Sequence, residues 1–219
     1  MFLSVIEPNI AVPDGANADS VYQFLVQGNV SETAEGFDLH VTACIFSLAN
    51  AESSSGQRSL SITTGLDPTD LAAVIDAFFP HAAWLTSDEP VLRGADEVCL
   101  LDLLRQCATD GTVLQRWLAA MIARRAQSPN HLWQDLGLRN RSELSRLMVR
   151  HFRPVAVRNT NDMKWKKFLY RMICRDAGYS LCTAPSCSEC CDFEVCFGDE
   201  SGESRLARVR LADDLGSKA

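Results

Sequence analysis

The sequence predicts a mainly α-helical protein, an antiparallel helical bundle that ends in a cysteine-rich loop. Apolar residues recur three and four positions apart over much of the chain, which is the spacing of amphipathic helices. Helix-starting and helix-ending residues separate these runs, such as Asp67-Pro68 before one and Gly111 after another. Strand signals are scarce, and we expect at most one short extended segment, at residues 60–64, where apolar and polar residues alternate.

Several amphipathic helices are predicted, and the short loop between those over residues 95–109 and 113–126 favours antiparallel neighbours. The first combines Phe37, Val41 and Leu48 on one face, and the second begins at Pro68 and ends before Pro80. Further helices are predicted over residues 95–109, 113–126, 130–136 and 140–151, the last of these ended by Pro154. A final strong helix, capped by Asn161 or Asp162, carries Met163, Phe168 and Met172 and stops at Gly178.

We expect four parts in the chain. Residues 1–36 form an N-terminal segment that is partly flexible, residues 37–180 a helical domain, residues 181–198 a cysteine-rich module and residues 199–219 a flexible tail. With 219 residues, of which 47% are hydrophobic, the chain is long enough for one good core. Two stretches are predicted to be flexible: residues 51–58, which are rich in serine and glycine, and the tail, whose charged and small residues cannot bury much surface.

Charge is distributed unevenly along the chain. The formal net charge of minus 7 argues against a general affinity for nucleic acid. Residues 139–175, however, hold eleven of the twenty-one basic residues and only two acids, a local charge of plus 9 that leaves minus 16 for the remainder. The first fifteen residues lack lysine and arginine, and no apolar run is long enough to span a membrane. We therefore expect a cytoplasmic protein without a membrane partner.

Four cysteines gather within fifteen residues, in the spacing C-x4-C-x2-C-x5-C: Cys182, Cys187, Cys190 and Cys196. Such crowding suits a polynuclear iron-sulfur cluster, because a cubane of four metals offers one corner to each thiolate. A structural zinc site usually has two cysteine pairs separated by a longer finger. Disulfides suit a reducing cytoplasm poorly, and the chain has an odd total of nine cysteines. A zinc knuckle or a disulfide pair remains an alternative at this point.

Other side chains are candidates for an additional metal bond, since molybdenum in place of one iron would want more ligands. Cys174 precedes the cluster by eight residues, and Cys191 adjoins the third cysteine. His131 and His151 are weaker candidates, because lone histidines on helices are more often structural. Three further cysteines on apolar helix faces are assigned to the core: Cys44, Cys99 and Cys107.

Several motifs, in one consistent order, resemble the NifQ family. They are HLWQDLGL at residues 131–138, the run 159–170 with DMKWKKF at its centre, Cys174, and the four-cysteine motif that ends in CFG at residue 198. The resemblance is close over residues 117–200 and looser from residue 37. It implies a role in supplying molybdenum for the iron-molybdenum cofactor of nitrogenase, and it attaches the family's metal binding to Cys182, Cys187, Cys190 and Cys196.

The resemblance and the residues together predict a carrier in nitrogen fixation. It would take up molybdate or another oxomolybdenum species, hold it in or beside an iron-sulfur cluster, and pass it to nitrogenase cofactor assembly proteins. The basic segment could attract the molybdate dianion or dock an acidic partner. We expect no enzymatic activity, because the chain has no G-x-S-x-G, P-loop or H-E-x-x-H motif.

Two other classes of protein stay open. The first is a metal- or redox-sensing regulator in which the helix over residues 140–151 contacts DNA, although the acidic remainder of the chain disfavours it. The second is a helical adaptor stapled by zinc.

Overall fold

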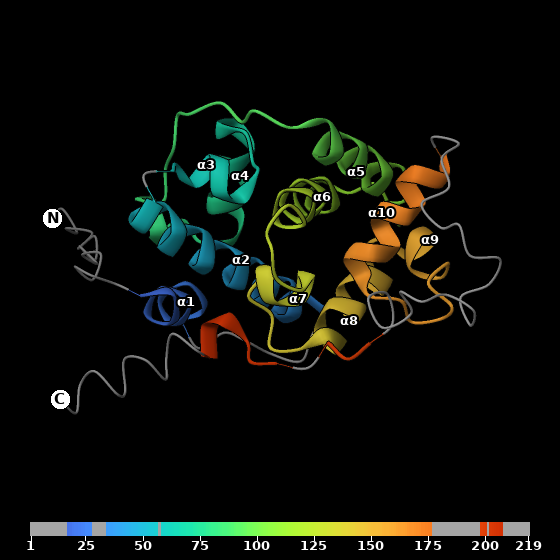
Figure 1. Cartoon of the computed structure of the whole chain (residues 1–219). Helices are drawn as coiled ribbons and strands as arrows, with labels where there is room; N and C mark the ends of the chain where they lie inside the picture. The colour runs from blue at the N-terminus through green and yellow to red at the C-terminus, as the bar shows by residue number, and fades with distance from the viewer. Residues whose placement is uncertain (1–16, 28–33, 57, 177–197, 201, 208–219) are drawn as a thin grey trace, which may run out of the picture.

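The computed structural model describes residues 17–27, 34–56, 58–176, 198–200 and 202–207, and within these ranges it contains helices and no strand (Figure 1). The longer helices are α1 (Ala18–Val26), α2 (Ala34–Gly56), α4 (Pro68–Phe78), α5 (Ala95–Gln106), α6 (Val113–Arg125), α8 (Arg141–His151) and α10 (Trp165–Asp176). Shorter pieces are α3 (Leu60–Thr64), the 3-10 helix η1 (Pro80–Ala82), α7 (Leu132–Asp135) and α9 (Arg153–Ala156). The predicted mainly α-helical class is confirmed.

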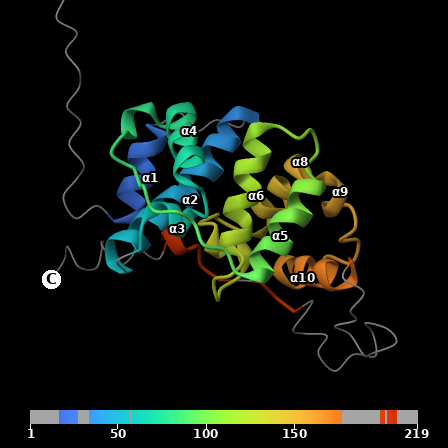
Figure 2. The ribbon, with the colours of Figure 1, turned by 90° about the horizontal axis from the view of Figure 1, so that it is seen from above.

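The long helix α2 runs through the body, and α1 and α3 pack against it. Helices α5 and α6 pack on each other, and α10 packs on α5. Helices α8, α9 and α10 gather at one end of the molecule, away from α1, α3 and α4 (Figures 1 and 2). After the cysteine-rich segment, the chain passes beneath α7 and α8 toward α1 (Figure 1). We call its described part, residues 198–200 and 202–207, the C-terminal strap.

Local capping explains the helices that were predicted with correct starts. Helix α4 has Pro68 in its first turn after Asp67 and ends before Pro80. Helix α6 begins with a capping box, in which the Thr112 side chain and the Gln115 side chain each accept a hydrogen bond from the other residue's backbone. Helix α8 begins after Asn140, whose side chain accepts from the backbone N–H of Glu143.

The extended segment expected at residues 60–64 is wrong, because these residues form α3. The Ser59 side chain caps the helix by accepting from the backbone N–H of Ile62, and Gly65 ends it with a φ of 76°. The Thr64 hydroxyl donates to the carbonyl of Leu60, which satisfies a polar group in the interior. Capping and packing against α2 and α6 therefore override the β propensity of isoleucine and threonine.

The expected flexible stretch at residues 51–58 also needs correction, since α2 continues to Gly56. The hydroxyls of Ser54 and Ser55 donate to carbonyls one turn earlier, and Glu52 forms ion pairs with Arg125 and Arg205. These long-range ion pairs stabilise a helical end that serine and glycine alone would leave weak.

The boundaries near the basic segment differ from the prediction as well. Neither Asn161 nor Asp162 caps α10, since the carbonyl of Lys164 accepts the first helical bond, from Phe168. Asp162 instead has a φ of 52° and binds the Arg141 guanidinium with its backbone and side-chain oxygens. Beyond α8, Pro154 lies in the first turn of the additional short helix α9. The predicted end of α10 at Gly178 lies outside the described residues.

The core assignment holds for Cys44 and Cys107, which are buried, and is wrong for Cys99, which is exposed. Helix α5 turns Leu100 and Leu104 inward together with Glu97. Glu97 tolerates this position because Arg124 pairs with it at 3.0 Å. The rotation of α5 that buries these residues leaves Cys99 on the outer side.

Helices α2 and α8 are joined by Asp38, which is buried and lies 2.9 Å from Nε2 of His151. Arg150 donates to the same carboxylate from two guanidinium nitrogens, at 3.0 and 2.9 Å. Burial by itself would raise the pKa of Asp38, but the hydrogen bonds from His151 and Arg150 outweigh it and lower the pKa below the ordinary value of 3.8.

We therefore expect the free energy of unfolding of Asp38→Asn to decrease less than that of the wild type as the pH falls into the acid range. A carboxyl with a lowered folded pKa contributes stability that is complete above its unfolded pKa, near pH 4, and is lost as the pH falls through the folded pKa. Urea unfolding between neutral and acid pH should show a shallower decline in the variant than in the wild type. Asp67→Asn is the control, because Asp67 is half-exposed and its ion pair with Arg93 is long, at 3.4 Å. If the free energy of unfolding depended on pH equally in both variants, the lowered pKa of Asp38 would not be a source of stability.

Candidate metal centre

The four cysteines of the predicted centre, and Cys191 beside them, lie outside the described residues. What the structure describes is the chain on both sides of them, which is α10 up to Asp176 and the strap from Gly198. Cys174 lies near the end of α10 as a half-buried free thiol. The site is therefore built from its two flanks.

On the C-terminal side, the strap is bound to α7 and to the start of α8. The buried carboxylate of Glu200 pairs with Nδ1 of His131 at 3.2 Å and with the guanidinium of Arg141. Three residues after Glu200, the strap is also held through its backbone, because Nε2 of Gln134 donates to the carbonyl of Glu203 at 3.1 Å. Three side chains of the α7–α8 region thus hold the strap just beyond the last cysteine.

The strap then enters the interior. Arg205 pairs with Glu52 of α2 at 2.7 Å and with the carboxylate of Asp135 at 3.5 Å. The side chain of Leu206 joins the hydrophobic core. The expectation that this stretch buries little surface is wrong for Glu200 and Leu206, because ion pairs and one apolar anchor replace the hydrophobic run that the sequence lacks.

On the N-terminal side, α10 is fixed by its apolar face and by one lysine. Phe168, Leu169 and Met172 are buried in the core. The ammonium of Lys166 donates to the carboxylate of Asp135 and to the carbonyl of Ser128. Burial lowers the pKa of Lys166, and the hydrogen bond to Asp135 opposes this shift. The charged lysine therefore depends on Asp135.

Asp135 joins both flanks within one set of charges, which we call the buried charge network: Glu52, Arg125, Asp135, Lys166 and Arg205. Asp135 is fully buried, and Arg125 is nearly so. Arg125 donates to the backbone carbonyl of Asp135 at 2.6 Å and to both carboxylate oxygens of Glu52. The network connects α2, α6, α7, α10 and the strap, so the described residues on both sides of the cysteine segment are bound to α7.

These contacts explain what the residues of the motif HLWQDLGL do in the structure. His131, Gln134 and Asp135 bind the strap or α10, and Trp133 is buried beside them. His131 was expected to be at most a weak candidate for a metal ligand, and roles for Gln134, Asp135, Glu200 and Arg205 were not predicted from the sequence. The available signal was the pair of polar residues inside an otherwise apolar run, which indicates buried polar contacts.

The two histidines that were considered as ligands both have carboxylate partners. His131 pairs with Glu200, and buried His151 pairs with Asp38 on the α2 side. The structure does not bring these histidines together with Cys174: in the described part of the chain no three His, Cys, Asp or Glu residues are grouped so that they could hold a metal ion.

Much of the charge of residues 139–175 is matched inside the fold. Arg141 pairs with Glu200 and Asp162, Arg150 with Asp38, and Lys166 with Asp135. The guanidinium of Arg146 lies over the Phe37 ring, 4.0 Å from its centroid. A high local charge in the sequence therefore does not translate into an equally cationic site.

A cavity of about 430 Å³ adjoins the first residues of the strap. It is lined by Trp133, Asn140, Arg141, Ser142, Asp162, Gly198, Asp199, Glu200 and Gly202. Three carboxylates surround its single guanidinium, and two of them pair with it. The negative balance disfavours a dianion such as molybdate in this cavity.

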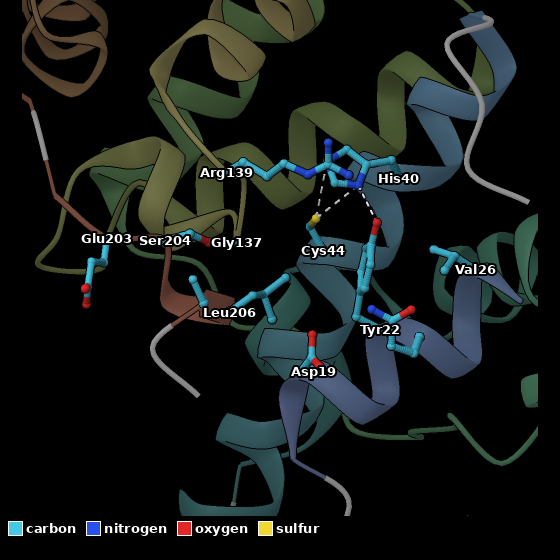
Figure 3. Close-up of a pocket in the computed structure, with 12 residues that line it drawn as sticks. Asp19, Tyr22, Val26, His40, Cys44, Gly137, Arg139, Glu203, Ser204 and Leu206 are labelled. Carbon is cyan, nitrogen blue, oxygen red and sulfur yellow. Dashed lines mark hydrogen bonds between the residues drawn. The ribbon is translucent and has the colours of Figure 1, made fainter. Parts of the chain in front are cut away.

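A second cavity, of about 570 Å³, lies between α1, α2 and the strap (Figure 3). At its edge the Tyr22 hydroxyl lies 2.7 Å from Nδ1 of His40, and Nε2 of His40 lies 3.2 Å from Glu143. The sulfur of Cys44 is almost equally far from both ring nitrogens, at 3.6 and 3.7 Å. Burial raises the pKa of Cys44 well above its ordinary value. This pair is therefore not an activated thiolate and base, because both ring nitrogens have closer partners and the thiol stays protonated.

None of the described helices has the length and apolar character that crossing a membrane requires.

Comparisons with known proteins agree with the motifs. The family model NifQ matches residues 41–198. The chain is 42% identical over 172 residues to the Protein NifQ homolog of Sinorhizobium fredii, covering 77% of this chain and 75% of that protein. It is 42% identical over 151 residues to Protein NifQ of Rhodobacter capsulatus, with 68% and 83% covered, and 33% identical over 162 residues to Protein NifQ of Azotobacter vinelandii, with 66% and 82% covered. No solved structure matches. A match of this extent, which includes the residues that build α7 and α10, shows that the chain belongs to the NifQ family.

Proposed function

We propose that the protein is a molybdenum carrier for assembly of the nitrogenase iron-molybdenum cofactor. Cys182, Cys187, Cys190 and Cys196 would hold an iron-sulfur cluster, and an oxomolybdenum species would be taken up in or beside it and passed to cofactor assembly proteins. Membership of the NifQ family supports the cofactor role. The observation that carries the metal site is the attachment of both flanks of the cysteine segment to α7.

Fixed flanks favour metal binding for an entropic reason. Closing a chain segment around a metal costs conformational entropy, and the cost is smaller when the two ends are already held close to one body. The buried charge network holds α10 and Arg205, while His131 and Arg141 hold Glu200, four residues after Cys196. The protein body thus contributes a preorganised frame, and the thiolates contribute the ligands.

Cys174 is the described residue best suited to an additional metal bond. It is a free thiol near the end of α10, half-buried, and eight residues before Cys182. His131 and His151 are less suited, because each is paired with a carboxylate. We infer a carrier without turnover of an organic substrate, since the sequence has no G-x-S-x-G, P-loop or H-E-x-x-H motif.

The experiment is elemental analysis and electron paramagnetic resonance on protein purified without oxygen. Cys187→Ala removes one thiolate of the proposed set, and we expect it to lose most of the iron and molybdenum and the cluster signal. Cys99→Ala is the matched control, because Cys99 is a free exposed thiol on α5. Retention of both metals in full by Cys187→Ala would overturn the site. A colourless protein with zinc and no iron or sulfide would identify a zinc-stapled adaptor instead.

A further inference from the structure

The end of the molecule formed by α8, α9 and α10 is rich in exposed cations (Figure 1). Its exposed cations, which we call the basic face, are Arg146, Arg150, Arg153, Arg158, Lys167 and Arg171. No carboxylate occurs in the sequence between Glu143 and Asp162, or between Asp162 and Asp176. No acid therefore lies in the sequence between Arg146 and Arg158, or between Lys167 and Arg171.

Two exposed apolar side chains lie among these cations. Val149 is 52% exposed and Val157 is 58% exposed, and both belong to the few large hydrophobic residues that the described part of the chain leaves exposed. Val149 follows Arg146 by three residues and precedes Arg150 directly, which places it on the outer side of α8. Val157 and Arg158 follow α9. Apolar contacts ringed by charge are the composition of a protein interface.

Some cations of the basic face interact with side chains of α2, and others form no ion pair with a described residue. Arg150 pairs with Asp38, and Arg146 lies over Phe37. The side chains of Arg153, Arg158 and Lys167 form no ion pair with any residue that the structure describes. These three give the face a positive charge that no carboxylate among the described residues pairs with.

The face borders both flanks of the cysteine segment. Lys167, Arg171 and Cys174 lie three and four residues apart on α10, so they share one side of that helix and lead toward the segment. At the other flank, α8 begins with Arg141 and Ser142 in the cavity that Gly198 lines. A molecule bound on α8 to α10 would therefore lie next to the proposed metal centre.

We propose that the basic face docks an acidic protein, the acceptor to which the metal passes. The inference rests on the proposed function, and it adds the chemistry of the partner. Cations spread over three helices cannot all contact one small dianion, so molybdate alone does not account for them. Duplex DNA fits less well than a protein, because the face includes exposed valines and the remainder of the chain carries minus 16.

The test combines charge reversal with photo-cross-linking of the full chain. A photoreactive amino acid replaces Val157, and in a control protein it replaces Leu92, which is 85% exposed elsewhere on the surface. The probes are individually purified nitrogenase cofactor assembly proteins. The reversal is Arg153→Glu with Arg158→Glu, and the control reversal is Arg58→Glu, an exposed arginine between α2 and α3, at the other end of the molecule from α8 to α10.

We expect Val157 to cross-link an assembly protein where Leu92 does not, with a cross-linked fraction that falls about tenfold on the basic-face reversal and much less on the control reversal. The proposal would be overturned if both reversals lowered the cross-linked fraction equally, or if neither lowered it. Binding to duplex DNA in about 50 mM salt that the basic-face reversal abolishes would overturn it in favour of nucleic acid.

Metal content separates this inference from the proposed function. Cross-linking requires no bound metal, so it can succeed even if the chain holds no molybdenum, in which case the carrier role fails alone. A metal-loaded chain that still transfers molybdenum at the wild-type rate after basic-face reversal would overturn the docking surface alone.

Discussion

Asp135→Asn is expected to lower the free energy of unfolding by about 3 to 5 kcal/mol, because it removes one partner from a buried set of ion pairs. The wild-type network sets the carboxylates of Glu52 and Asp135 against the cations Arg125, Lys166 and Arg205. With asparagine at position 135, Arg125 and Arg205 would be left with the carboxylate of Glu52 alone. Asparagine has a single side-chain oxygen, which could accept from Lys166 or from Asn130, so one of these two donors would lose its acceptor. Urea unfolding of the metal-free protein measures the change.

Asp162→Asn is the matched control, since it changes the same atoms in an aspartate that also pairs with an arginine, at 2.7 Å. Asp162 is 81% exposed, and an exposed pair contributes about 0 to 1 kcal/mol. Asparagine also tolerates the positive φ of this position. A similar small loss in both variants would show that the network around Asp135 contributes little to stability.

The same network shows which parts of the fold could be predicted. Helices α4, α6 and α8 were predicted because their signals are local, with caps at Asp67, Thr112 and Asn140 next to an apolar repeat. Residues 60–64 were assigned wrongly because their helix depends on tertiary packing against α2 and against α6, and α6 is about 50 residues away in the sequence. The end of α2 is stabilised by the ion pairs of Glu52 with Arg125 and Arg205, and no local sequence pattern predicts these long-range partners.

The sequence predicts ligands for the candidate site, but it does not predict the residues that hold the two flanks of the cysteine segment. The spacing of Cys182 to Cys196 is a property of the sequence alone, and it stays a prediction because these residues lie outside the described ones. The frame is made of long-range pairs: Glu200 with His131 and Arg141, and Arg205 with Asp135. Counting charges over residues 139–175 gave the right total, but it could not show which cations face carboxylates inside.

Gly137→Ala is expected to destabilise the protein by about 3 kcal/mol or more, through strain and a steric clash together. Gly137 follows α7 with a φ of 74°, which side chains other than glycine rarely adopt. A Cβ there would lie 2.8 Å from the carbonyl oxygen of Cys44 and 3.0 Å from the Leu48 side chain. Neither neighbour can move easily, because both belong to the buried middle of α2.

Gly111→Ala separates the two causes. Gly111 has a similar φ of 66°, but a Cβ there would meet nothing within 4 Å, so only the backbone strain of about 1 to 2 kcal/mol remains. The excess loss in Gly137→Ala then measures how tightly α7 is seated on α2. Since α7 carries Gln134 and Asp135, a displaced α7 would also loosen the strap and α10, and metal retention should fall in Gly137→Ala but not in Gly111→Ala. Equal unfolding free energies for the two variants would mean that α2 yields to the added methyl group, and that α7 is not held rigidly.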